Sequence, residues 1–453
     1  MKDYITLRKQ YMDFIYHGWE IEETDASFTI TYAFEIVGLQ SFHPTFTLPK
    51  PGNDQPYMTS RIFKEAVFSL GMVELISYWK ITGAPRVHIA CGHLDEKQKA
   101  WWKKLYFHGL GEYFHINHIP LDPDGFMEII SEGKPQTGTD WLPHVTGNLI
   151  PVGGGKDSFV TLDVLSPYKK DNLAFIINPV ISAVNSAHAA GYTEGKDLLI
   201  AKRTLDQGML ELNKQGYLNG HTPFSAMVAF ATYLTSFVYG RKYITLSNES
   251  SANESTIKGS TVNHQYSKTF EFEQDFHAYC HAYLWDGISY FSLLRPISEL
   301  QITGLFSKLK DYHPVFRSCN VGSKKGVWCG HCAKCLFVCL MLSAYLPQSE
   351  IIEIFGVDML NDETMTDLFE QLTGMVDDKP FECVGTRDEV NTAVCMAIST
   401  MQKENRQIPY LYRRYMESTY YQAYRDRSVD MQAWNSENLL SKTYQEILKN
   451  RLR

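Results

Sequence analysis

A glycine-rich segment joins an apolar run to a stretch with helical periodicity, and its residue types suit phosphate binding. It follows the apolar run 149–152, precedes the helical pattern 159–165, and consists of Gly153, Gly154, Gly155, Lys156, Asp157 and Ser158. Glycines let the backbone approach a ligand closely and turn its N–H groups toward it. The N-terminal end of a following helix adds partial positive charge. We therefore predict a cradle for an anionic group here, rather than an ordinary strand–helix turn.

Two common phosphate-binding motifs do not fit this segment. The motif G-x-x-x-x-G-K-[ST] needs a hydroxyl residue after its lysine, whereas Asp157 follows Lys156. The dinucleotide motif G-x-G-x-x-G needs a final glycine where Ser158 stands. The segment instead resembles the S-G-G-x-D-S pyrophosphate loop of the N-type ATP pyrophosphatases, which cleave ATP between the α and β phosphates.

This resemblance implies how the loop would bind ATP. Gly153, Gly154, Gly155 and Ser158 would hold the pyrophosphate, and Lys156 is counted with them as part of the ATP-binding loop. Asp157 would help to organise Mg²⁺, which prefers oxygen ligands, and is therefore also counted among the catalytic and metal-binding residues. Gly153 departs from the family's loop, which has Ser there. One hydroxyl donor is lost, so the backbone must do more of the binding.

A second polar segment, 247–255, follows a predicted strand at 243–246. The carboxyl ends of parallel strands face the ligand crevice, so side chains here are well placed for binding. Asn248, Glu249 and Asn253 are candidates to contact the adenine or ribose, or to hold Mg²⁺. A solvated turn with a helix cap would use the same residue types, and the sequence leaves both interpretations open.

A cluster of cysteines suits a metal ion. Cys319, Cys329, Cys332 and Cys335 offer four thiols, three of them at the spacing of C-x-x-C turns. Four such donors are typical of a closed, structural Zn²⁺ site. His331 is a possible substitute ligand, whereas Cys339 lies on an apolar helix and is expected to be a buried core thiol. The competing interpretation is a redox or sulfur-carrying pair. Similar four-cysteine sites occur beside the pyrophosphate loops of the 7-cyano-7-deazaguanine synthases.

The elements that would position these residues suggest a mixed α/β protein. The first part is β-rich with two helices, the region from residue 148 alternates strands and helices as in a parallel sheet, and the chain after Cys335 is mostly helical. We take the segment 131–146, rich in Gly, Pro and Thr, as a linker. The prediction is an α+β domain at 1–145 and a parallel-sheet, pyrophosphate-loop domain of the adenine-nucleotide alpha-hydrolase type at 146–453, ending in a helical tail.

Composition narrows the function further. The 453 residues carry a formal net charge of −8 at pH 7, which argues against nucleic acid as the main partner but allows a local basic groove. No signal-like segment opens the sequence, and the most apolar stretch, 223–240, is too short and too rich in Ser and Thr for a convincing membrane span. We predict a cytoplasmic protein without a membrane partner.

Three further segments extend the resemblance to most of the chain. They are GLGE at 109–112, NESSAN at 248–253, and PFECVGT at 380–386 after LTG at 372–374. With the loop and the cysteines, they resemble the ATP-dependent UDP-N-acetylmuramoyl-L-alanyl-L-glutamate epimerases of bacterial cell-wall synthesis. The resemblance implies a small-molecule UDP-sugar dipeptide substrate, ATP and Mg²⁺ as co-substrate and cofactor, and release of AMP and pyrophosphate.

Proton transfer at the glutamate needs a base and an acid. Cys383 is a candidate, because a thiolate can serve as base when its pKa is lowered, although a buried structural cysteine is an equal alternative. His264 and His277 are the other candidates. Two other functions stay open: another pyrophosphate-loop enzyme, either similar to the deazapurine nitrile synthases or tRNA-modifying, and a zinc-stapled binding protein without catalysis.

Overall fold

The computed structural model describes residues 2–52, 55–250, 266–322, 325–377, 380, 384–427 and 429–453. Within these residues, eleven strands form one sheet in the order β11-β10-β7-β8-β9-β4-β2-β1-β5-β6, and β3 pairs with β2. The strands are β1 (Asp13–Glu23), β2 (Ser27–Ile36), β3 (Gln40–Phe42), β4 (Thr45–Pro49), β5 (Arg86–Ile89), β6 (Glu128–Ser131), β7 (Thr146–Pro151), β8 (Asn172–Ile177), β9 (Leu198–Thr204), β10 (Arg241–Leu246) and β11 (Ser289–Ser292).

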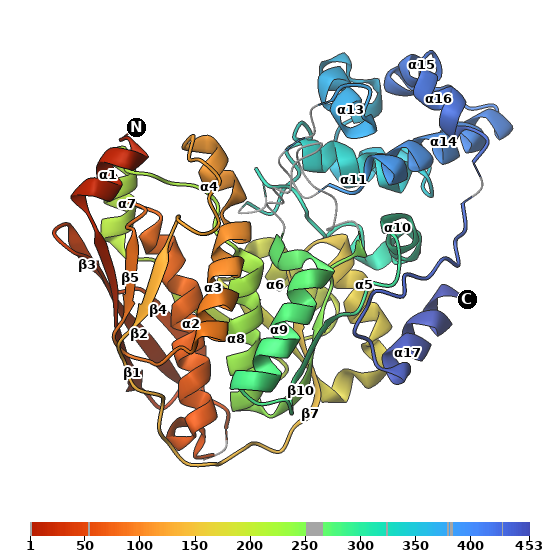
Figure 1. Cartoon of the computed structure of the whole chain (residues 1–453). Helices are drawn as coiled ribbons and strands as arrows, with labels where there is room; N and C mark the ends of the chain where they lie inside the picture. The colour runs from red at the N-terminus through yellow and green to blue at the C-terminus, as the bar shows by residue number, and fades with distance from the viewer. Residues whose placement is uncertain are drawn as a thin grey trace.

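Helices cover this sheet and form a separate group toward the C-terminal end (Figure 1). They are α1 (Tyr4–Gln10), α2 (Arg61–Trp79), α3 (Glu96–Gly109), α4 (Gly111–Ile116), α5 (Lys156–Val164), α6 (Ile181–Ala189), α7 (Gln207–Lys214), α8 (Phe224–Tyr239), α9 (Phe270–Tyr283), α10 (Glu299–Ser307), α11 (Ala333–Ser343), α12 (Gln348–Phe355), α13 (Thr366–Thr373), α14 (Arg387–Lys403), α15 (Tyr410–Met416), α16 (Thr419–Tyr424) and α17 (Lys442–Leu452). The predicted alternation after residue 148 and the helical region after Cys335 are confirmed.

The sheet has two kinds of pairing. β11, β10, β7, β8 and β9 run parallel to their neighbours, as the sequence predicts for this part of the chain. β4, β2 and β1 pair antiparallel, and the alternating burial along β2 and β4 matches a sheet with one face in the core. The strand order reverses direction between β7 and β10, which makes this the switch point where ligands bind in open parallel sheets.

The antiparallel and parallel parts are continuous. β4 pairs antiparallel with β9, with Thr45 opposite Thr204, so the sheet crosses the predicted boundary near residue 145. One apolar core also contains side chains from both sides of that boundary, such as Val67 on α2 and Phe230 on α8. α2 is buried almost all round because it packs against both the sheet and α8. The division into two domains stays a prediction.

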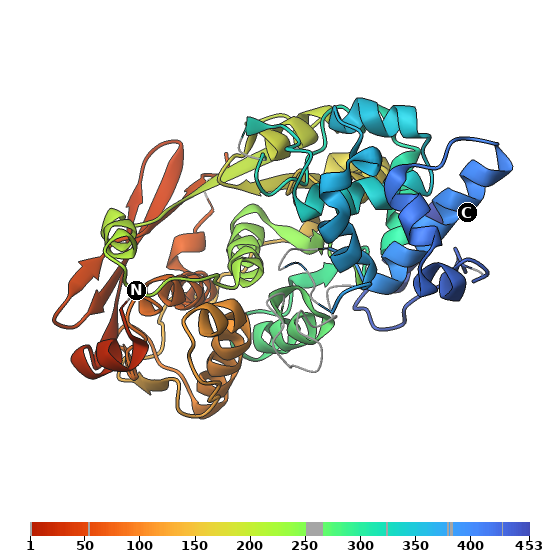
Figure 2. The ribbon, with the colours of Figure 1, turned by 90° about the horizontal axis from the view of Figure 1, so that it is seen from above.

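A second apolar core joins one side of the parallel strands to the C-terminal helices. Seen from above, these helices lie beside the parallel strands, at the opposite end of the molecule from the N-terminal strands (Figure 2). After this group the chain returns to the sheet. On α17, Tyr444 hydrogen-bonds Asn148 of β7, and Arg451 pairs with Asp163 of α5. Cys339 on α11 is fully buried, as predicted for a core thiol.

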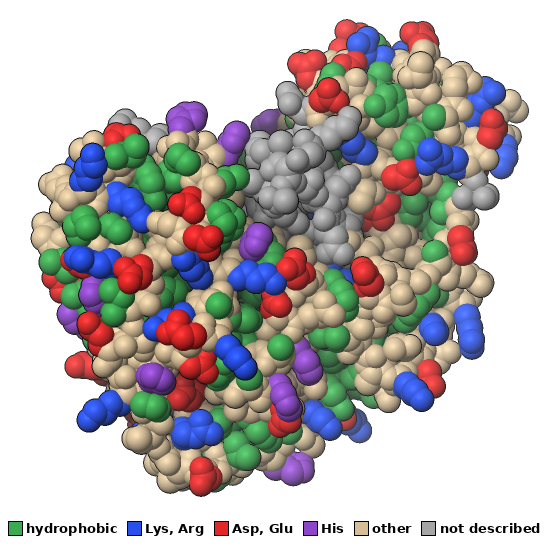
Figure 3. Space-filling view, viewed as in Figure 1, with side chains coloured by type: hydrophobic (Ala, Val, Ile, Leu, Met, Phe, Trp, Pro, Cys, Tyr) green, Lys and Arg blue, Asp and Glu red, His purple; other side chains and the backbone are tan. Residues whose placement is uncertain are grey.

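Charged side chains of both signs are interspersed over the described part of the face in Figure 3. This matches a chain whose acidic and basic residues nearly balance, 51 against 43. Among the described residues, none of the helices has the length and apolar character needed to cross a membrane.

Candidate active site

The glycine loop connects β7 to α5, and the backbone explains why two of its positions are glycine. Gly154 has φ +88°, which L side chains rarely adopt, and a Cβ there would lie 2.8 Å from the backbone nitrogen of Ala183. Gly155 is the N-cap of α5, and a Cβ there would lie 2.8 Å from the Oγ of Ser318. Gly153 differs, because a Cβ there would meet only the Ser158 Oγ, at 3.8 Å. The Gly153 N–H donates to that Oγ at 3.1 Å, so Ser158 closes the loop on itself.

The loop opens onto a cavity of about 610 Å³ at the carboxyl ends of β7, β8 and β10. One wall is the loop itself, and another is the segment 246–249 after β10. Apolar side chains form part of the lining, among them Phe175, Val180, Phe224 and Val228. A cavity with apolar walls, backbone donors and a few charged groups has the make-up of a small-molecule site. The predicted residues from the loop and from 248–249 therefore do meet.

Lys156 is absent from the cavity lining, and its ammonium group is already paired with carboxylates. Its side chain is only 3% exposed, and its Nζ lies between two carboxylates, contacting Asp157 and lying 2.6 Å from Glu299. Burial alone would lower the pKa of Lys156, but these carboxylates outweigh it and raise the pKa above its ordinary value. Lys156 thus places one positive charge between the buried Glu299 and the partly exposed Asp157.

Glu299, which sequence reasoning missed, completes a set of carboxylates. Oxygen atoms of Asp157, Glu249 and Glu299 all lie within 4.8 Å of one another, close enough for a single cation. Burial raises the pKa of Glu299, and the Lys156 charge offsets part of that effect. A capping box at Ser298 fixes the start of α10, and the Glu299 N–H donates to Glu389 at 2.8 Å. This oxygen-rich set suits Mg²⁺.

Among the described residues, the cations that line the cavity are Lys268, Arg317 and Lys334. Arg317 was also missed, although its position two residues before Cys319 is visible in the sequence. Burial lowers the pKa of the Arg317 guanidinium. Its side chain donates to backbone carbonyls, those of Gly326 at 3.1 Å and Phe316 at 2.6 Å. The cavity therefore has an acidic end and a basic wall.

A second arginine, which is buried outside the cavity lining, connects two segments of the cavity wall. Arg295 is 0% exposed and donates to the carbonyl of Glu249 at 3.0 Å and to that of Lys268 at 2.6 Å. Its ion pair with the buried Glu273, at 3.2 Å, balances the charge. Both carbonyls belong to residues that line the cavity, so this buried pair positions the wall. Nothing in the local sequence distinguishes Arg295 from a surface arginine.

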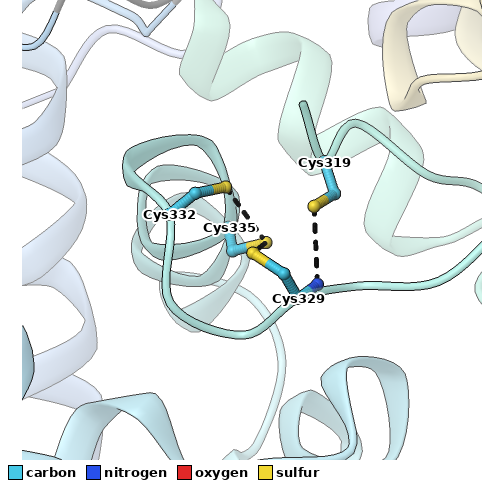
Figure 4. Close-up of side chains that lie close together, drawn as sticks. All are labelled: Cys319, Cys329, Cys332 and Cys335. Atoms are coloured by element: carbon cyan, nitrogen blue, oxygen red, sulfur yellow. Dashed lines mark hydrogen bonds between the residues drawn. The ribbon is translucent and has the colours of Figure 1, made fainter. Parts of the chain in front are cut away.

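The four predicted cysteines do come together, at the start of α11 and in the segment before it (Figure 4). Their ligand atoms all lie within 4.8 Å of one another. Cys329 Sγ lies 3.7 Å from Cys335 Sγ, and Cys332 Sγ lies 3.5 Å from it. Cys319 Sγ accepts backbone N–H groups from Gly322 at 3.1 Å and Cys329 at 3.4 Å. Such a set of thiols, oriented by backbone donors, is compatible with Zn²⁺.

Hydrogen bonding divides the protons unevenly within this cluster. The hydrogen bond between Cys332 and Cys335 lowers the pKa of the Cys332 thiol and raises that of the Cys335 thiol. His331 is exposed, and its Nδ1 lies 2.7 Å from the Cys329 carbonyl, so it is not one of the four clustered ligands.

The remaining candidates have different outcomes. Asn253, His264 and Cys383 lie outside the described residues. His277 is described, and it occupies an exposed position on α9, outside the lining of the cavity. Asn248 is at the cavity, and its amide donates to Ser292 at 3.2 Å.

Comparison with known proteins places this arrangement in a family. The family model described as the MurL N-terminal domain matches residues 5–293, and that of the MurL C-terminal domain matches 315–426. The chain belongs to the MurL family. The glycine loop and Glu249 fall within the first match, and Arg317 and the cysteines within the second, so the cavity is built from both.

Three relatives carry the name UDP-N-acetyl-alpha-D-muramoyl-L-alanyl-L-glutamate epimerase. One from a Micromonospora strain is 34% identical over 82% of this chain and 83% of its own length. One from Xanthomonas oryzae pv. oryzae is 33% identical over 74% and 75%, and one from Salinispora tropica is 35% identical over 79% of each. These relatives are epimerases, which are isomerases. No solved structure matches the chain.

Proposed function

We propose that this MurL-family protein converts the terminal L-glutamate of UDP-N-acetylmuramoyl-L-alanyl-L-glutamate to D-glutamate for peptidoglycan synthesis, with ATP and Mg²⁺. The observation that carries the proposal is the shared name of relatives about 34% identical over most of the chain. The glycine loop at the carboxyl end of a parallel strand supports the use of ATP. It also supports assigning this part of the fold to the pyrophosphate-loop superfamily.

Adenylation gives the epimerisation a chemical route. The α-proton of a glutamate beside an ionised carboxylate is barely acidic. In the proposed first step, the α-carboxylate oxygen attacks the α-phosphorus of ATP and pyrophosphate leaves. The carboxyl group then carries no negative charge, so the electron pair left at Cα after deprotonation can delocalise into the acyl group. A proton returned to the opposite face inverts the centre, and water releases AMP. We propose the α-carboxylate on this chemical argument.

The described residues divide this work among themselves. The backbone of the glycine loop and the N-terminal end of α5 would receive the pyrophosphate. Asp157, Glu249 and Glu299 offer oxygen ligands for Mg²⁺, which would neutralise charge on the leaving group. The apolar lining and Asn248 are available to the nucleoside. The proposed binding therefore depends on a local arrangement, because a chain of net charge −8 does not attract polyanions as a whole.

The proton-transfer residues stay predictions. Cys383 and His264 are proposed as base or acid by their residue types alone. If Cys383 transfers the proton, Cys383→Ala abolishes D-glutamate formation but leaves substrate-dependent pyrophosphate release. Undiminished D-glutamate formation by this variant removes Cys383 from the mechanism.

The four cysteines are proposed as a closed, structural Zn²⁺ site. A site with four protein ligands leaves no position for substrate, so its contribution is to the fold.

One assay tests the proposed function. The protein is incubated with ATP, Mg²⁺ and the UDP-linked L-alanyl-L-glutamate, and both pyrophosphate and the configuration of the glutamate are measured. Pyrophosphate together with D-glutamate is the expected result. Pyrophosphate formed only with a deazapurine or a tRNA identifies the alternative enzyme class that the adjacent cysteine cluster favours. No pyrophosphate with any of these substrates indicates a binding protein.

A further inference from the structure

Arg317 is a cation at the cavity that has no acidic partner among the residues that the structure describes. Among the described residues, its guanidinium donates to two backbone carbonyls, and no carboxylate pairs with it. The other buried arginine near the cavity, Arg295, has Glu273 to balance its charge. A partly buried cation that has no counter-ion and lines a cavity is suited to an anionic ligand.

Arg317 also lies against the glycine loop. Its backbone N–H donates to the Gly154 carbonyl at 2.9 Å. The next residue, Ser318, packs so closely that a Cβ on Gly155 would lie 2.8 Å from its Oγ. The segment carrying Arg317 is therefore fixed beside the loop that would bind pyrophosphate. Arg317 and the loop also line the same cavity.

The cysteine cluster fixes the same segment from the other side. Gly326, whose carbonyl accepts from Arg317 Nε, lies in the segment between Cys319 and Cys329. The ring of Trp328, next to Cys329, has its centroid 5.9 Å from the guanidinium carbon. Lys334, between Cys332 and Cys335, lines the same cavity. The cluster thus brings together Cys319 and Cys329, and Gly326 and Trp328 between them both contact Arg317.

We propose that Arg317 binds the phosphates of the nucleotide, and that the four-cysteine cluster acts as the positioning element that holds Arg317 against the glycine loop. The first part rests on the proposed use of ATP. The second part assigns the cluster an effect on nucleotide affinity in addition to its effect on the fold. Arg317 is the fork-shaped donor that complements the backbone N–H groups of the loop, since Lys156 is already occupied by two carboxylates.

Binding of inorganic pyrophosphate, measured by calorimetry in the presence of Mg²⁺, tests Arg317. Arg317→Met is expected to weaken binding ~10–100-fold, the effect of losing a charged hydrogen-bonding partner. Arg317→Lys keeps the charge but loses the fork, and is expected to lie between Arg317→Met and the unchanged protein. Arg241→Met is the matched control. Arg241 is also a partly buried arginine that donates to a backbone carbonyl, but it lies at the opposite end of the strands.

Each outcome has a separate meaning. Equal binding by the unchanged protein and Arg317→Met overturns the role of Arg317. Equal weakening in the Arg241→Met control also overturns it, because the effect would then be a general loss of stability. If the unchanged protein binds neither pyrophosphate nor ATP, the proposed function itself fails.

A Cys332→Ser variant tests the cluster, with zinc content and thermal unfolding measured alongside. Loss of zinc together with pyrophosphate binding weakened to about the level of Arg317→Met, in protein that is still folded, supports the coupling. The double variant Arg317→Met, Cys332→Ser is then expected to bind pyrophosphate no more weakly than either single variant. Loss of zinc with unchanged pyrophosphate binding overturns the coupling and leaves the role of Arg317 to its own test. If Cys332→Ser does not fold, the same comparison is made on the unchanged protein with zinc removed by a chelator.

Discussion

The part of the chain that the structure describes has two clusters of potential metal ligands, and they differ in how their charge is balanced. The carboxylates of Asp157 and Glu299 already hold the ammonium group of Lys156, a cation supplied by the protein. Among the described residues, the four thiols contact backbone N–H donors and one another, and no cation of the protein lies between them. A cluster that carries its own cation can accept and release a metal without leaving buried charge unbalanced. A cluster of thiolates without one depends on a resident metal.

The largest effect is expected from the carboxylate cluster. Asp157→Asn removes a Mg²⁺ ligand and a partner of Lys156, and we expect pyrophosphate release to fall ~10³-fold, the scale found when a group that stabilises a transition state is removed. Asp163→Asn is the control, because Asp163 lies on the same helix but pairs with Arg451 away from the cavity. Comparable losses in both variants would mean that damage to α5, and not metal binding, explains the effect.

In the glycine loop, substitution of Gly154 should reduce binding nearly as strongly, whereas substitution of Gly153 should be tolerated. Gly154→Ala must adopt φ +88° and place a Cβ 2.8 Å from a backbone nitrogen, so we expect ~10²-fold weaker pyrophosphate binding and ~1–3 kcal/mol lower stability. Gly153→Ser meets no such contact and restores the serine of the pyrophosphate-loop family, so its activity should be kept or increased. Equal loss in both variants contradicts this difference.

Substitution of Glu299 should lower the rate less, and a glutamine there tests the charge of the side chain while keeping its shape. Glu299→Gln keeps the volume but weakens the metal site, and we expect about a tenfold lower rate at limiting Mg²⁺, recovered in part at high Mg²⁺. Because burial raises the pKa of Glu299, its ionised form is costly to the fold, but Glu299→Gln also removes a charged partner of the buried Lys156, so the thermal midpoint should change little. A rate independent of Mg²⁺ concentration would exclude Glu299 as a ligand.

Loss of metal from the carboxylate cluster should lower activity, whereas loss of metal from the cysteine cluster should lower stability. Omitting Mg²⁺ from the assay is expected to stop pyrophosphate release without changing the thermal midpoint, and added Mg²⁺ should restore the release. Removal of zinc by a zinc chelator is expected to lower the midpoint by several degrees, roughly 2–4 °C per kcal/mol for a domain of 150–250 residues, with a modest effect on the rate at saturating ATP once Mg²⁺ is resupplied. A midpoint that falls when Mg²⁺ is omitted and recovers with Mg²⁺ alone would reverse the comparison.

The sequence predicted those features whose residues are neighbours along the chain. The glycine loop, the four cysteines and most strands are of this kind, because spacing and periodicity are local. Glu299 could not be found this way, since it contacts Lys156 across a long separation in sequence and only the packing of α10 against α5 brings them together. Arg295 and the pairing of β4 with β9 were missed for the same reason.

The return of α17 to the sheet has a consequence for biosynthesis. Tyr444 hydrogen-bonds Asn148, a residue 296 positions earlier on the strand that leads into the glycine loop. A ribosome therefore delivers the nucleotide-binding strand long before it delivers the helix that covers it. Until Lys442–Leu452 has been translated and docked, one side of α5 lacks its cover, and the nascent chain presents apolar surface to chaperones.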